Sequence, residues 1–135
     1  MALTVHHLGI AVSDLVDAVA RYESLFGASV EHRAVVADQG VEAASLLVGS
    51  SRLELLQPLG PDTPVGRFLA NRGPGMHHVA FEVTDLPAEL ARLRAAGIQL
   101  IDEIPRLGLF GLQVAFVHPD ATGGVLAELV SDERR

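Results

Sequence analysis

Alternating apolar and polar residues predict the strands of this chain. Residues 4–12 (TVHHLGIAV) and 76–83 (MHHVAFEV) have the period of two that places successive side chains on opposite faces of a sheet. Three further strands are predicted in each half of the chain. They cover residues 28–36, 41–48 and 52–57 in the first half, and 98–104, 112–118 and 124–131 in the second.

A helix is predicted directly after each opening strand. Ser13 and Thr84 are small polar residues that we expect to be the N-caps. Gly27 and Gly97 suit the left-handed conformation that ends many helices. Apolar residues at helical spacing should form the buried stripes, which are Leu15, Val19, Tyr22 and Phe26 in one helix and Leu86, Leu90, Leu93 and Ala96 in the other.

The two halves of the chain are copies of one pattern. His7 matches His78 at an offset of 71 residues, and Glu54 matches Glu128 at an offset of 74. Each copy reads as a βαβββ module, 4–59 and 75–131, and the Pro- and Gly-rich link between them contains a short helical pattern. A half-size sheet cannot close a core alone. We therefore expect a single α+β domain over residues 1–135, in which two tandem modules form a curled mixed sheet around a metal cavity.

The strand period separates the histidines of the two His-His pairs. His6 shares a face with apolar residues that should pack on the helix, whereas His7 shares the other face with Gly9 and Ala11. The same argument assigns His77 to the packed face and His78 to the face with small neighbours. Small neighbours leave room for a ligand, so the second histidine of each pair is the candidate.

Two glutamates complete the candidate metal site. Glu54 and Glu128 lie inside apolar strand runs, where an ionised carboxylate needs compensation. Two imidazoles and two carboxylates from equivalent places are a suitable ligand set for one divalent cation. A nitrogen and oxygen set without thiolate suits Co, Mn, Ni, Zn or Fe.

We do not expect most of the other histidines, or Glu82, to take part in the metal site. We expect His32 and Glu82 to be exposed, and His6 and His77 to belong to the packing. His118, at a strand end, could be structural or could line the cavity.

Composition narrows the chemistry and the partners. The chain is 49% hydrophobic, has a net charge of −7, and contains no cysteine. All ten basic residues are arginine, so lysine and cysteine chemistry are excluded. The acidic charge disfavours nucleic acid, and no apolar run reaches the ~20 residues that span a bilayer. With no signal-peptide pattern at the start, we expect a cytoplasmic protein without a membrane partner.

With its two His-His pairs and its two strand glutamates, the chain resembles the vicinal oxygen chelate superfamily of glyoxalases, bleomycin resistance proteins and dioxygenases. Its members pair βαβββ modules around a metal, and the match falls on His7, Glu54, His78 and Glu128. Within the superfamily the chain is similar to the methylmalonyl-CoA epimerases. The phrases that carry this likeness are HHLGIAVSDL, QGVEAASL, LELLQPLGPDTPVGRFLANRGPGMHHVAFEV, IDEIPRLG and VAFVHPDATGGVLAELV.

The resemblance implies an enzyme, an isomerase that interconverts (2R)- and (2S)-methylmalonyl-CoA. A divalent metal would stabilise the enolate formed when the α-proton leaves an acyl-CoA substrate. Inversion needs a base on one side of the carbon and an acid on the other. Glu128 is the first choice for this role and Glu54 the partner, each also a metal ligand. The family usually forms homodimers, so a homodimer is expected.

The chain departs from the family pattern at three places. Some epimerases use a glutamate two residues beyond the QGV phrase, where this chain has Ala43; its Glu42 lies one residue earlier and should point to the other face. Asp120 replaces a frequent lysine. The loop 106–113 (RLGLFGLQ) is bulkier and more apolar than the usual glycine-rich loop, and its Arg106 could meet a phosphate or carboxylate or be solvated.

Three alternative functions use the same fold. A glyoxalase-type isomerase would use the same four ligands on a glutathione hemithioacetal. An extradiol dioxygenase needs three ligands within one module, which fits less well. A non-catalytic small-molecule-binding protein usually lacks the ligand set that this chain retains.

Overall fold

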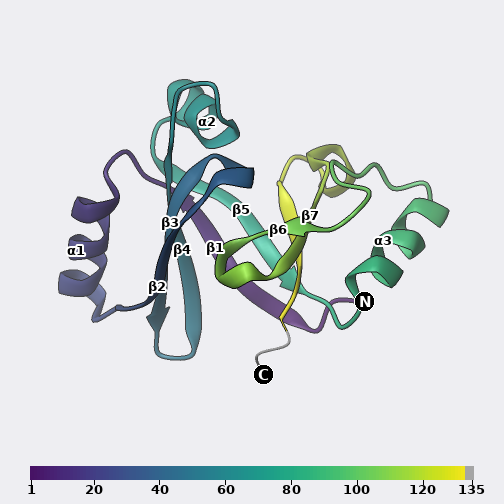
Figure 1. Ribbon diagram of the computed structural model, residues 1–135, viewed down its shortest axis with the longest axis horizontal. Helices are drawn as coiled ribbons and strands as arrows, with labels where there is room; N and C mark the ends of the chain where they lie inside the picture. Colours follow the sequence, from purple (N-terminus) through teal and green to yellow (C-terminus); the bar gives the residue numbers. More distant parts are fainter. Residues whose placement is uncertain (133–135) are drawn as a thin grey trace. The chain divides into compact units, whose positions relative to one another are not determined.

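The computed structural model describes residues 1–132, which contain eight strands and three α-helices (Figure 1). The strands are β1 (Thr4–Ala11), β2 (Ser29–Val36), β3 (Val41–Val48), β4 (Ser51–Pro58), β5 (Gly75–Glu82), β6 (Arg106–Leu107), β7 (Gln113–Val117) and β8 (Ala127–Ser131). The α-helices are α1 (Leu15–Phe26), α2 (Pro64–Arg72) and α3 (Leu86–Ala95), and short 3₁₀ turns cover Ala37–Gln39, Leu109–Gly111 and Pro119–Thr122. The predicted α+β class and the two βαβββ modules are confirmed, and α2 is the helix predicted in the link.

The chain divides into two compact units. One consists of residues 7–77, and the other of residues 1–6 with the described residues from His78 onward. Contacts explain why the first six residues belong to the second unit. The Leu3 amide donates to the Glu82 carbonyl at 2.8 Å, and His6 Nε2 lies 2.7 Å from Asp132 Oδ2.

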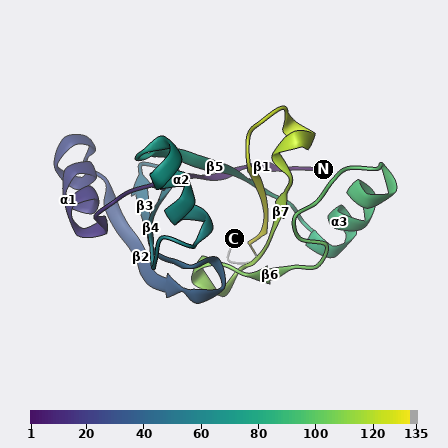
Figure 2. The same ribbon diagram turned by 90° about the horizontal axis from the view of Figure 1, so that it is seen from above.

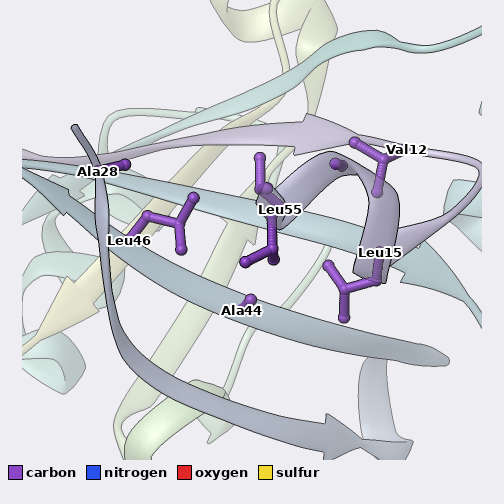
Figure 3. Packing of buried hydrophobic residues seen from close by; sticks show 8 residues of the cluster. Val12, Leu15, Ala28, Ala44, Leu46 and Leu55 are labelled. Atoms are coloured by element: carbon purple, nitrogen blue, oxygen red, sulfur yellow. The ribbon is translucent and has the colours of Figure 1, made fainter. Parts of the chain in front are cut away.

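The 7–77 unit contains a four-stranded mixed sheet in the order β2-β3-β4-β1. β1 runs parallel to β4, whereas β3 is antiparallel to both β2 and β4. Helix α1 covers one face of this sheet (Figure 1). Figure 3 shows the core beneath it, where Leu15 of α1 packs with Leu46 and Leu55 of the sheet, all of them 0% exposed. The side chains that alternate with these core residues, such as Glu54 next to Leu55, project from the opposite face of the sheet.

The ends of α1 have clear local causes. The side chain of Asp14 accepts a hydrogen bond from the Asp17 amide at 3.1 Å, so Asp14 is the N-cap instead of the predicted Ser13. A carboxylate caps the positive end of the helix dipole better than a hydroxyl. Gly27 ends the helix with φ 68°, as predicted. Phe26 was expected in the buried stripe, but it is 61% exposed because it stands in the last turn.

The second unit repeats this plan with the strand order β5-β8-β7-β6. β5 is parallel to β8, and β8 is antiparallel to β7. Helix α3 lies along its sheet (Figure 2), and the fully buried Leu86 and Leu90 pack against Ala115 and Leu129. Asp85 caps α3 instead of the predicted Thr84, and Ala96 is exposed instead of buried.

The predicted strand 98–104 is wrong. This segment makes one isolated bridge, Leu100 to Val117, and the strand of the module is the two-residue β6 further along. The side chain of Asp102 explains the difference. It accepts a hydrogen bond from the Phe116 amide at 2.8 Å, which is a backbone group that a regular ladder would use.

The helices of residues 1–132 are too short or too polar to cross a bilayer.

Candidate functional site

The 7–77 unit contributes one histidine–glutamate pair. His7 Nε2 lies 3.4 Å from Glu54 Oε2, and the two side chains are 3% and 9% exposed. His7 comes from β1 and Glu54 from β4, whose parallel register sets Gly9 opposite Glu54. Both side chains occupy the face of the sheet away from α1, because Leu55, the neighbour of Glu54, packs in the α1 core.

The second unit contributes an equivalent pair. His78 Nε2 lies 3.4 Å from Glu128 Oε1, and these side chains are 1% and 2% exposed. Here β5 is parallel to β8, and Ala80 is opposite Glu128. In both units the glutamate is therefore opposite the residue two positions after the histidine. The two halves of the chain therefore repeat both the strand register around the glutamate and the histidine–glutamate distance.

The donor set of each pair fits a divalent cation. Each unit supplies one imidazole nitrogen and one carboxylate oxygen, which are ligands that Zn, Co, Mn and Ni accept. Two ligand atoms ~2.1 Å from a tetrahedral ion are ~3.4 Å apart. The observed separation of 3.4 Å in each pair matches that spacing, and it is longer than a usual N–H···O hydrogen bond.

An aromatic ring supports His78 on the sheet. Phe116 of β7 is opposite Glu128 in the register, and its ring meets the His78 imidazole edge to face at 5.7 Å. The Arg106 guanidinium lies over the same ring at 5.3 Å, and Arg106 Nε is 3.3 Å from Asp102 Oδ2. Of the roles expected for Arg106, the structure shows contact with a carboxylate, that of Asp102. Sequence reasoning missed Phe116, because only the register of β7 with β8 places it beside Glu128.

Sequence reasoning also missed three residues near Glu54. Ser45 is opposite Glu54 on the neighbouring strand, and its hydroxyl donates to Glu31 Oε2 at 2.8 Å. Arg52 makes two further hydrogen bonds with the Glu31 carboxylate. The strand period assigns Ser45 and Arg52 to the site-facing side, but the pairing of their strands is not visible in the sequence.

Glu42 points away from Glu54, as the one-residue step predicts. It belongs to the same face of β3 as Ala44, which packs under α1, and its Oε2 accepts a hydrogen bond from Arg33 Nε at 3.2 Å. Ala43 occupies the opposite face, beside Ser45, and is fully buried.

The remaining histidines have structural surroundings. His6 is buried against Asp132, and His77 meets the Phe68 ring at 5.1 Å. His118 Nδ1 accepts a hydrogen bond from the Asp120 amide at 3.1 Å, so it caps a 3₁₀ turn. His32 is half-buried instead of exposed.

Glu82 is 4% exposed, which contradicts the predicted exposed role. It ends β5 on the same face as His78, and its strand partner Val130 is also buried. The end of a strand is therefore not at the surface here.

The bulky loop between β6 and β7 is tightly folded. Phe110 has φ 64°, the one positive φ outside glycine within residues 1–132, and Leu109 is buried. The Gly108 amide donates to the Leu112 carbonyl at 2.8 Å, which closes the loop. A large side chain in this conformation is strained. The loop thus holds a large apolar side chain in a backbone conformation that glycine adopts without strain.

Comparison with known proteins identifies the family of this chain. Residues 6–116 match the family model of the Glyoxalase/Bleomycin resistance protein/Dioxygenase superfamily. The chain is 43% identical to the Bacillus subtilis protein YqjC, over 91% of this chain and 88% of that one. It is 37% identical to the Cereibacter sphaeroides ethylmalonyl-CoA/methylmalonyl-CoA epimerase, over 92% and 94% of the two chains.

Solved structures extend the likeness to the fold. A methylmalonyl-CoA epimerase from Streptomyces coelicolor, solved with 2-nitronate-propionyl-CoA, superposes with a TM-score of 0.95 at 37% identity and covers 99% of this chain and 97% of its own. The predicted resemblance to these epimerases is confirmed. The chain belongs to the glyoxalase/bleomycin resistance/dioxygenase superfamily.

Proposed function

We propose that this chain is a metal-dependent methylmalonyl-CoA epimerase that interconverts the (2R) and (2S) forms of its substrate. The observation that carries the proposal is the pair of equivalent, buried histidine–glutamate pairs with the same 3.4 Å N–O separation. Relatives named as methylmalonyl-CoA epimerases, from Cereibacter sphaeroides and human mitochondria, support the substrate class.

His7, Glu54, His78 and Glu128 together would hold one divalent ion. Two buried carboxylates carry a negative charge that a cation neutralises, which offsets the cost of burying them. The ion, when bound, supplies Lewis-acid stabilisation of the negative charge that develops on the thioester oxygen. The candidate ions are Co, Mn, Ni and Zn.

Two carboxylates would carry the proton. Glu128, ionised at that stage, would take the α-proton from one face of the carbon between the thioester and the carboxylate, and Glu54, carrying a proton at that stage, would donate it to the opposite face. The roles exchange for the other stereoisomer. No lysine or cysteine exists in this chain to act instead, and Glu42 points to the α1 side of its sheet.

A CoA thioester is the proposed partner. The S. coelicolor epimerase was solved with 2-nitronate-propionyl-CoA, which supports this class. The cytoplasmic location and the homodimer stay predictions from the sequence.

The direct test follows exchange of the α-proton in deuterated water. Metal-loaded protein with (2R)- or (2S)-methylmalonyl-CoA should incorporate deuterium and lose optical purity. Absence of exchange with Co(II)- and Mn(II)-loaded protein would refute the epimerase. Turnover of a glutathione hemithioacetal in its place would favour the glyoxalase-type alternative.

The shared ion has its own test. Wild-type protein should bind one equivalent of Co(II), and His7→Ala or His78→Ala should abolish tight binding. One tight equivalent on either variant would mean that a single pair suffices, and the shared-ion proposal would fall.

A further inference from the structure

A group of three linked polar side chains lies beside Glu54 in the 7–77 unit. Arg52 donates from Nε and Nη2 to the two carboxylate oxygens of Glu31, each at 2.8 Å. The Ser45 hydroxyl donates to Glu31 Oε2, also at 2.8 Å. Ser45 is fully buried, and the side chains of Glu31 and Arg52 are only 19% and 21% exposed. The group is therefore a fixed part of the sheet face.

The backbone places this group next to the proposed metal ligand. Ser45 is directly opposite Glu54 in the antiparallel register, and Arg52 precedes Glu54 by two residues on β4, so both share its face. The register of β2 shifts between Val30 and His32, which makes Glu31 the extra residue of a β-bulge. Bulges re-aim side chains, and here the bulge directs Glu31 toward Ser45.

An arginine at this position is a competitor for the carboxylate of Glu54. Its side chain is long enough to reach a residue two positions along the strand, and guanidinium binds carboxylate through two parallel hydrogen bonds. Glu54 paired with Arg52 would no longer be available to His7 and a metal ion. The two hydrogen bonds to Glu31 instead occupy the Nε and Nη2 donors of Arg52.

We propose that Glu31 is a positioning residue that holds the Arg52 guanidinium away from Glu54. Glu54 then stays beside His7 as a metal ligand and acid–base group. Ser45 fixes the carboxylate of Glu31 in the orientation that captures Arg52. This inference rests on the proposed function, since it concerns the use of Glu54 as a ligand.

A pair of variants and their combination tests the idea by Co(II) titration, followed by calorimetry and by the visible absorption of bound Co(II). Glu31→Gln removes the negative charge that attracts Arg52 and should weaken Co(II) affinity at least tenfold. Arg52→Met should bind within threefold of wild type. The double variant should also return to within threefold, because the competitor is gone. A purely structural salt bridge predicts the opposite, a double variant at least as weak as Glu31→Gln.

Matched controls separate this effect from general damage. Glu42→Gln removes an equally simple Arg33–Glu42 ion pair on the α1 side of the same sheet, and it should leave Co(II) affinity unchanged. Where Glu31→Gln does not fold, Ser45→Ala loosens Glu31. It should weaken binding two- to threefold, and Arg52→Met should again restore it.

The outcomes distinguish this inference from the proposed function. A wild-type chain that binds no Co(II) overturns both. Wild-type binding together with an unchanged Glu31→Gln affinity, or a double variant that stays weak, overturns only the role of Glu31. Weak binding by Glu31→Gln with full recovery in the double variant supports it.

Discussion

Replacement of Glu128 by glutamine tests the acid–base proposal most directly. The side chain is 2% exposed and lies 3.4 Å from His78 Nε2, so an isosteric amide should occupy the same space without a cavity. The change removes the negative charge and the proton acceptor together. A positioned general base contributes about 10²–10⁴-fold to rate. At 1.36 kcal/mol per tenfold, the barrier should rise by roughly 3–5 kcal/mol.

The assay follows the α-proton signal by NMR in deuterated water with saturating Co(II). Each stereoisomer of methylmalonyl-CoA is supplied separately. Glu128→Gln should lose exchange for one stereoisomer, and Glu54→Gln should lose it for the other, because the proposed mechanism assigns each carboxylate to one side of the carbon. Saturating metal ensures that a weaker ligand does not imitate a missing base.

Glu82→Gln is the matched control for this prediction. Glu82 is another buried carboxylate on the His78 face of β5, but it lies four residues further along the strand. This variant should retain nearly full exchange. Exchange rates for metal-saturated Glu128→Gln within threefold of wild type with both stereoisomers would refute Glu128 as the base.

Three further predictions concern positioning, packing and pH. Phe116→Leu should lower Co(II) affinity about tenfold in a titration, since outer contacts orient metal ligands, whereas Phe81→Leu on the α3 side should not; equal losses would contradict the positioning role. Leu55→Ala should lower the free energy of unfolding by about 3 kcal/mol in urea, because Leu55 is 0% exposed; a loss below ~1 kcal/mol would contradict tight packing. The hydrogen bond from Arg92 and that from the N-terminal amine lower the pKa of Glu89. Glu89 should therefore stabilise the fold above the usual carboxyl pKa of ~4.3 and lose that contribution as the pH falls through its lowered value, so urea unfolding of Glu89→Gln should show a flatter acid limb. Identical acid limbs would contradict this.

The sequence by itself determined the repeat, most of the helices and strands, and the four candidate metal ligands. Period-two patterning separated His7 from His6 because the side-chain direction in a strand follows from local geometry alone. The match between Glu54 and Glu128 was visible because the two halves of the chain repeat one pattern of residues. The one-residue step of Glu42 also predicted its face correctly.

Tertiary structure decided what depends on partners distant in the chain. The segment 98–104 has strand-like residues, but the Asp102 carboxylate accepts the Phe116 amide and the regular ladder does not form. Glu82 is 4% exposed although it is the last residue of β5. Register placed Ser45 opposite Glu54, and a bulge brought Glu31 to Arg52. Pairing between strands is a long-range choice, so the local pattern of one strand cannot specify which side chains another strand sets beside it.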